Sequence, residues 1–179
     1  MPSGTLMGLC GSLRSGSFNR KLMMEASRAF DPGVFIDGNL RLPLYDGDLE
    51  EAEGIPTEVQ ALADQIASAD AVIVVGPEYN KAISGVLKNA LDWISRTKGS
   101  PWNGKPVAIL SATAGRSGGE RTQLSMRECM VAFRPRLILG PEVLIGGASK
   151  EFDGDTLTGE MGRKLLGEQM TALRMAAGL

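Results

Sequence analysis

The stretch Gly11-Ser12-Leu13-Arg14-Ser15-Gly16-Ser17-Phe18-Asn19 decides how this chain begins to fold. An apolar run, Thr5–Cys10, precedes it, and apolar residues recur at helical spacing after it, at Leu22, Met23, Ala26 and Phe30. We therefore expect a buried strand, this loop, and then a helix. The N–H groups of a first helical turn lack intrahelical partners and carry roughly half a positive charge, so serine hydroxyls and Arg14 beside them suit a phosphate monoester. The plainer alternative is a polar turn in which Ser17 only caps the helix.

Apolar runs and helical patterns alternate along the rest of the chain. The expected strands are Thr5–Cys10, Val34–Ile36, Ala71–Val75, Val107–Leu110 and Leu137–Ile145. The expected helices after the first are Pro56–Ser68, Ser84–Arg96, a less regular segment Gly118–Phe133, and Gly159–Ala177. This α/β alternation predicts a parallel sheet covered by helices on both faces, a three-layer sandwich. The polar connection Leu40–Ile55 is expected to be a surface loop.

Length and composition indicate one domain, residues 1–179. A net charge of −2 argues against nucleic acid or an anionic membrane as the main partner. The chain has no histidine, which excludes imidazole-dependent hydrolases and His-ligated zinc sites. We expect Cys10 and Cys129 to be free thiols, and we expect no metal. Because no signal-peptide pattern and no apolar run near the length of a membrane span, about 18 residues, is present, we expect cytoplasmic residence.

In such sheets, ligands bind outside the carboxyl ends of the strands, where the strand order reverses. Three loops should meet there: Gly11–Asn19, Gly76–Ser84 and Ser111–Gly119. In the second, Pro77-Glu78-Tyr79-Asn80 presents an aromatic ring and polar groups to a flat ligand, unless Tyr79 merely packs on the next helix. The third offers hydroxyls and glycines that let backbone approach a ligand closely.

Together the three loops resemble a known family. The segments Gly11–Asn19, Pro77–Asn80, Gly85–Trp93 and Ser111–Gly119 are similar to the ordered motifs of the NAD(P)H-dependent FMN reductases, a flavodoxin-like group that includes quinone, chromate, ferric and azo-dye reductases. The resemblance spans most of the chain. It implies a five-stranded parallel sheet in the order 2-1-3-4-5 and a bound FMN. The chain departs from the family pattern after the glycines, where Leu124-Ser125-Met126-Arg127 replaces a segment that commonly contains histidine.

The resemblance also implies roles for particular residues. Those expected to hold the FMN phosphate are Ser12, Arg14, Ser17, Phe18 and Asn19. Those expected to line the isoalloxazine are Pro77, Glu78, Tyr79 and Asn80, with Thr113 and Gly115 closing the opposite side. No residue is expected to act as a catalytic acid or base, because the reaction takes place at N5 of the FMN.

The expected activity is therefore that of an FMN-dependent NAD(P)H:acceptor oxidoreductase. The resemblance implies ping-pong hydride transfer from NADH or NADPH to FMN, and then reduction of small molecules such as quinones, chromate, ferric chelates or azo compounds. An alternative is a flavodoxin-type electron carrier without its own NAD(P)H turnover, and another is a flavin-free scaffold on the same fold.

The helix Ser84–Arg96 is apolar on more than one side, since Trp93 lies off its main apolar stripe. One subunit can hardly bury both sides, so we expect a homodimer or homotetramer formed through this helix, as the resemblance also implies. The alternative is that Trp93 is covered by the loop that contains Pro101 and Trp102.

Overall fold

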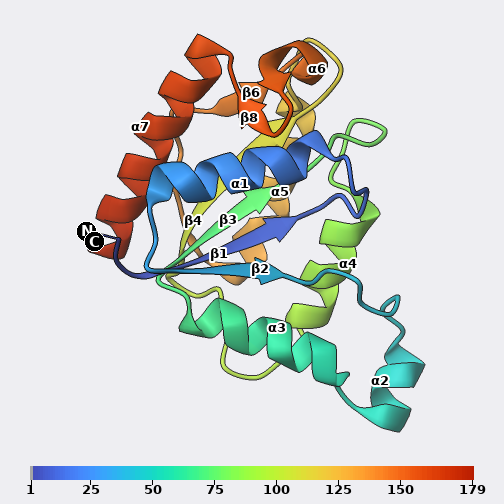
Figure 1. The fold of residues 1–179 in the computed structure, drawn as a ribbon. Helices are drawn as coiled ribbons and strands as arrows, with labels where there is room; N and C mark the ends of the chain where they lie inside the picture. Colours follow the sequence, from blue (N-terminus) through green and yellow to red (C-terminus); the bar gives the residue numbers. More distant parts are fainter. Residues whose placement is uncertain (1) are drawn as a thin grey trace.

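The computed structural model describes residues 2–179 and contains one large parallel sheet. Five strands follow the order β2-β1-β3-β4-β5, which confirms the predicted 2-1-3-4-5 arrangement, and β6 also pairs with β4 (Figure 1). The strands are β1 (Thr5–Cys10), β2 (Val34–Gly38), β3 (Ala71–Val75), β4 (Pro106–Ala112), β5 (Arg136–Leu137) and β6 (Val143–Ile145). Every residue of β3 and β4 is buried, as a strand covered on both faces requires.

Helices cover both faces of the sheet and produce two separate apolar cores. On one face lie α1 (Phe18–Phe30) and α7 (Glu160–Ala177), and on the other lie α3 (Thr57–Ser68), α4 (Gly85–Ile94) and α5 (Glu120–Met130) (Figure 1). The predicted helices therefore form within a few residues of their expected bounds. No helix within residues 2–179 has both the length and the apolar character needed to cross a membrane.

The fifth strand was expected to be continuous, and this prediction is wrong. Residues 138–142 leave the sheet between β5 and β6, and Leu139 there is 76% exposed. β5 and β6 lie at the edge of the sheet, and Pro141 between them has no N–H to donate to β4, so the chain pairs with β4 in two short pieces. The second piece, β6, follows the carboxyl-end half of β4 and supports the loop that comes after it.

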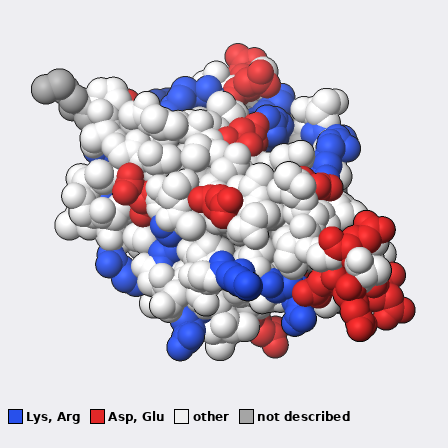
Figure 2. Space-filling view, turned by 90° about the horizontal axis from the view of Figure 1, so that it is seen from below, with Lys and Arg blue, Asp and Glu red and all other residues white. Residues whose placement is uncertain are grey.

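The connection Leu40–Ile55 is not wholly a loop, because it contains a helix, α2 (Gly47–Glu53). The carboxylate of Asp46 accepts the N–H of Asp48 over 2.9 Å and caps this helix. None of its residues is buried, so no apolar periodicity marks it in the sequence. The acidic side chains of residues 46–53 gather over α2 at one end of the face seen in Figure 2.

Short elements near the C-terminus were also not predicted. They are α6 (Ala148–Glu151), β7 (Phe152–Asp153) and β8 (Thr156–Leu157), whereas η1 (Val131–Phe133) lies within the segment Gly118–Phe133 that was expected to be helical. The buried side chains of Phe152 and Leu157 extend the core beneath α1 and α7. Segments this short carry too few residues for a periodic pattern, so the sequence gives no sign of them.

Trp93 is fully buried within the single chain, so the expectation that one subunit can hardly bury both sides of its helix is wrong. Its Nε1 donates to the carbonyl of Pro43 over 2.8 Å, and its ring meets that of Tyr45 edge to face at 5.0 Å. The Asn89 side chain fixes the same segment, donating to Pro43 and accepting the Tyr45 N–H. The segment that covers Trp93 is the chain after β2, whereas Trp102 packs against Phe133.

Candidate functional site

An open cavity of about 330 Å³ lies beyond the carboxyl ends of β1, β3 and β4. Its lining consists of Ser12, Arg14, Ser17, Phe18, Asn19, Pro77, Glu78, Tyr79, Ala112, Thr113 and Ala114. Every residue expected at the site is therefore in the lining except Asn80 and Gly115, each of which is the next residue along a lining loop. Residues from three separate segments of the chain thus meet in one place, which we call the main cavity.

The β1–α1 loop forms the polar, positively charged end of the main cavity. Ser17 is the N-cap of α1, and its Oγ accepts the N–H of Asn19 over 3.2 Å. The Arg14 guanidinium donates to the carbonyl of Gly16 over 3.1 Å and has no carboxylate partner among residues 2–179. This donor set, with a helix N-terminus and no acid opposing it, fits a phosphate group.

Asn19 is buried, and its side-chain amide is used within the protein. Its Nδ2 donates to the carbonyl of Ala112 and its Oδ1 accepts the N–H of the same residue, both over 2.9 Å. These two bonds join the first turn of α1 to the end of β4. The Asn19 amide therefore holds two walls of the main cavity together.

The β3–α4 loop is a tight turn that presents Tyr79. The N–H and C=O groups of Tyr79 and Ala82 pair with each other over 3.2 and 3.1 Å. Between them Asn80 and Lys81 have φ values of 51° and 69°, the left-handed region that favours glycine. The Tyr79 side chain is 52% exposed, so the ring is not buried against the following helix.

Glu78 lines the main cavity, but its carboxylate is bound to the N-terminus of α5. Its Oε2 accepts the N–H groups of Arg121 and Thr122 over 3.1 and 3.4 Å. The Thr122 hydroxyl donates back to the carbonyl of Pro77 over 3.1 Å. A carboxylate at this end of a helix also interacts favourably with the helix dipole. The wall that contains Tyr79 is thus fastened to α5.

A second group of buried side chains fastens the loop after β4 in the same way. Gln123 Nε2 donates to Ser111 Oγ over 3.0 Å and to the carbonyl of Val143 over 2.9 Å, and Ser111 Oγ donates to the carbonyl of Gly118 over 2.6 Å. Thr113 Oγ1 donates to the carbonyl of Gly115 over 3.0 Å. The supporting roles of Thr122 and Gln123 were not predicted, because the groups that their side chains bind lie on other segments of the chain.

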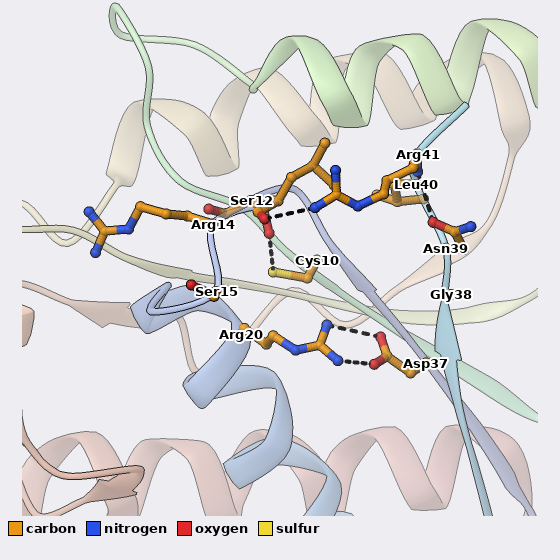
Figure 3. A pocket seen from close by; sticks show the side chains of 11 residues that line it. Cys10, Ser12, Arg14, Ser15, Arg20, Asp37, Gly38, Asn39, Leu40 and Arg41 are labelled. Carbon is orange, nitrogen blue, oxygen red and sulfur yellow. Dashed lines mark hydrogen bonds and ion pairs between the residues drawn. The ribbon is translucent and has the colours of Figure 1, made fainter. Parts of the chain in front are cut away.

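A second cavity, of about 380 Å³, adjoins the main cavity and shares Ser12 and Arg14 with it. It is lined by residues 10, 12–15, 20 and 37–41, and sequence reasoning did not identify it. Figure 3 shows Arg41 on one side of it, donating to the Leu13 carbonyl over 3.2 Å, and the Arg20–Asp37 ion pair on the other. We call it the arginine cavity.

The Cys10 side chain lies between those two sides of the arginine cavity (Figure 3). Burial raises the pKa of this thiol, although the carbonyl of Ser12 accepts a hydrogen bond from Sγ over 3.5 Å. Burial likewise raises the pKa of Cys129, and both cysteines are free. A thiol with a raised pKa is a weak nucleophile, so neither cysteine is suited to covalent catalysis.

Comparison with known proteins agrees with this geometry. A family model described as NADPH-dependent FMN reductase matches residues 5–150. An NAD(P)H-dependent FMN reductase of Pseudomonas aeruginosa is 40% identical over 173 residues, which cover 95% of this chain and 93% of the relative. A quinone reductase of Escherichia coli K12 is 40% identical over 152 residues, covering 83% of this chain and 80% of the relative.

Among solved structures, the flavoenzyme NAD(P)H:(acceptor) oxidoreductase FerB of Paracoccus denitrificans superposes with a TM-score of 0.87. It is 30% identical, and the match covers 98% of this chain and 97% of FerB. The matched family model covers most of the chain, and the sheet order and the three meeting loops agree with a flavodoxin-like fold. The chain belongs to the NADPH-dependent FMN reductase family.

Proposed function

We propose that this protein is an FMN-dependent NAD(P)H:acceptor oxidoreductase that binds its flavin in the main cavity. Family membership makes it an NAD(P)H-dependent reductase of the FMN and quinone reductase class. The observation that carries the finer proposal is the meeting of three loops around one cavity of suitable size and donor chemistry. The unit that binds FMN is the whole chain, residues 1–179, acting as a single flavodoxin-like domain.

In this proposal the β1–α1 loop holds the FMN phosphate. Arg14 has no competing carboxylate, and Ser12 and Ser17 bring hydroxyls to the same end of the cavity. The first-turn N–H groups of α1 add donors that the helix itself leaves unused. Phe18 lines the wall beside them, where its ring lies 5.5 Å from that of Phe152. Asn19 contributes by fixing α1 against β4 through its side-chain amide, and that amide is not assigned to the phosphate.

The isoalloxazine would lie against Pro77, Glu78 and Tyr79, with Asn80 at the edge of this wall and Thr113 and Gly115 closing the other side. Tyr79 exposes a ring face, while Glu78 and Thr122 hold its loop in place. FMN, when bound, supplies the redox chemistry, taking a hydride from NAD(P)H and giving electrons to an acceptor. The protein therefore has to bind and orient the flavin and NAD(P)H, and it needs no acid or base at the reacting atoms. The one carboxylate in the lining of the main cavity, Glu78, already accepts two N–H groups.

We also propose that the acceptors extend from quinones to chromate, ferric chelates and azo compounds. The main cavity is open and Tyr79 is half exposed, so acceptors of different shapes can reach a flavin bound there. NAD(P)H and the acceptor would use the same opening in turn, which predicts ping-pong kinetics. We expect this chemistry to take place in the cytoplasm.

A homodimer or homotetramer formed through the α4 face completes the proposal. Trp93 is buried and so gives no support to this subunit contact. Leu44, on the segment that covers α4, is 82% exposed. On α5 and just after it, Leu124 and Val131 are 57% and 74% exposed at a spacing of seven residues, so they lie on one side. Exposed large apolar side chains are typical of a subunit contact where they share a face. Light scattering coupled to size-exclusion chromatography measures the assembly directly.

The decisive experiment is the visible spectrum of the FMN-loaded protein before and after anaerobic addition of NADH or NADPH in separate cuvettes. Prompt bleaching of the flavin band near ~450 nm is expected, since the hydride chemistry belongs to the cofactor. Each acceptor is then added in turn to record reoxidation. A bound flavin that stays oxidised would identify an electron carrier, and a protein that takes up no FMN would contradict the assignment of all three loops.

A further inference from the structure

We propose that the arginine cavity binds the adenosine end of the nicotinamide dinucleotide and that Arg41 recognises the 2′-phosphate that distinguishes NADPH from NADH. The inference rests on the proposed function and deepens it, because it names the preferred electron donor and the residue that selects it.

The first support is charge. Three arginines, Arg14, Arg20 and Arg41, line the cavity, whereas Asp37 is its one acidic lining residue. Asp37 is paired with Arg20 through both carboxylate oxygens. Among residues 2–179, neither Arg14 nor Arg41 has a carboxylate partner. The cavity therefore keeps a positive charge that a phosphate dianion would neutralise through charge-assisted hydrogen bonds.

The second support is the position of these residues in the fold. In dinucleotide-binding α/β sheets, an acidic residue about 20 positions after the glycine-rich turn accepts the ribose 2′-hydroxyl of NAD, whereas a nearby arginine accommodates the 2′-phosphate of NADP. Asp37 is in β2, the strand that follows α1, and its carboxylate is occupied by Arg20 (Figure 3). Arg41 projects over the same cavity from the other side. The occupied acid disfavours NADH, and the Arg41 guanidinium, which donates only to the Leu13 carbonyl and has no carboxylate partner among residues 2–179, favours NADPH.

The third support is continuity with the main cavity. Ser12 and Arg14 line both cavities, so one elongated ligand can pass from the main cavity over the β1–α1 loop. Leu13, 40% exposed, is an apolar surface on this path and lines the arginine cavity. In the view of Figure 3, Arg14 extends away from Arg41 and Arg20. The arginines can thus serve two different phosphates, with Arg14 assigned to the flavin and Arg41 to the nucleotide.

The test measures binding of two probes to the FMN-loaded protein by titration calorimetry. Adenosine 2′,5′-bisphosphate and adenosine 5′-monophosphate differ only in the 2′-phosphate, so their affinity ratio isolates that group. We expect the bisphosphate to bind about tenfold more tightly to the wild type, the size of one charged hydrogen bond, and Arg41→Gln to abolish this difference. Arg41→Lys should retain part of it. The matched control is Arg163→Gln, which removes one exposed positive charge from α7 and should change nothing.

Kinetics give an independent readout. The ratio of kcat/KM for NADPH to that for NADH should fall about tenfold in Arg41→Gln, as the loss of one charged hydrogen bond predicts. Equal affinity of the wild type for both probes would overturn the inference, and so would an Arg41→Gln protein that keeps the preference. A variant that loses affinity for FMN but not for the bisphosphate would overturn it too, because the cavity would then serve the flavin phosphate.

The probes separate this inference from the proposed function. If the bisphosphate binds as expected but neither dinucleotide reduces the flavin, the site is supported and the reductase proposal fails. If NADPH and NADH reduce the flavin equally well and the probes bind equally, the reductase stands and the assignment of Arg41 fails.

Discussion

The two cavities share a wall but are built in opposite ways. Around the main cavity, polar side chains are buried and bonded to backbone on another segment, as Asn19 is to Ala112 and Gln123 is to Val143. Around the arginine cavity, the charged side chains are exposed and come from α1, β2 and the segment after β2. The main cavity is therefore held rigidly by the protein's own hydrogen bonds, whereas the arginine cavity is lined by charges that a ligand can still engage.

Asn19→Leu should produce the largest effect, because it breaks the fastening of the main cavity. It leaves the N–H and C=O groups of Ala112 without their partner in a buried place, at a cost of about 3 kcal/mol in the free energy of unfolding. Urea unfolding measures this loss. Asn103→Leu changes an exposed asparagine and should stay within about 0.5 kcal/mol of the wild type. Equal stabilities of the two variants would show that the main cavity is not held in this way.

Arg14→Gln tests the charged end of the main cavity. The variant should weaken FMN binding by about tenfold, because one charged hydrogen bond to phosphate is lost. Quenching of flavin fluorescence on titration of the apoprotein gives the Kd. Riboflavin, which lacks the phosphate, should bind both proteins with similar affinity. A parallel loss of riboflavin affinity would place Arg14 elsewhere than at the phosphate.

Lys81→Gly tests whether the turn beside Tyr79 is strained. Lys81 has a φ of 69°, so glycine should stabilise the protein by about 1 kcal/mol by removing a left-handed side-chain residue. Thermal and urea unfolding measure the gain. Lys88→Gly, in the middle of α4, provides the opposite control and should destabilise by about 1 kcal/mol. A destabilised Lys81→Gly protein would mean that the turn depends on the lysine side chain.

Asp37→Asn should have the smallest effect on stability. It tests the contrast between the arginine cavity and the main cavity. The Arg20–Asp37 pair is exposed, with 45% and 36% of the two side chains accessible, and such pairs contribute about 0.5 kcal/mol or less. Urea unfolding at low and high salt should show a difference from the wild type that shrinks as salt screens it. A loss of several kcal/mol that persists in salt would show that this cavity, too, is held by its own interactions.

The parts of the molecule that could be predicted from the sequence are those determined by contiguous residues. The buried runs of β1, β3 and β4 give the sheet, and the loop before Phe18 marks the end of the main cavity that we propose for the phosphate. Arg41 was not identified because it lies in the segment Leu40–Ile55, which was expected to be a surface loop, and its hydrogen bond to the Leu13 carbonyl joins two loops that are distant in the sequence. The cover of Trp93 by Pro43 was missed for the same reason, and the subunit contact inferred from that tryptophan lost its basis.

The carboxylate of Glu78 has a consequence for how subunits and cofactor influence each other. Because it joins the Tyr79 turn to the first residues of α5, displacement of that helix also displaces the wall proposed for the flavin ring. The outer side of α5 carries the exposed Leu124, which belongs to the proposed subunit contact. Assembly and flavin binding would then be thermodynamically linked, and each would change the affinity of the other by the same factor. The FMN affinity measured for such a protein would then depend on the protein concentration.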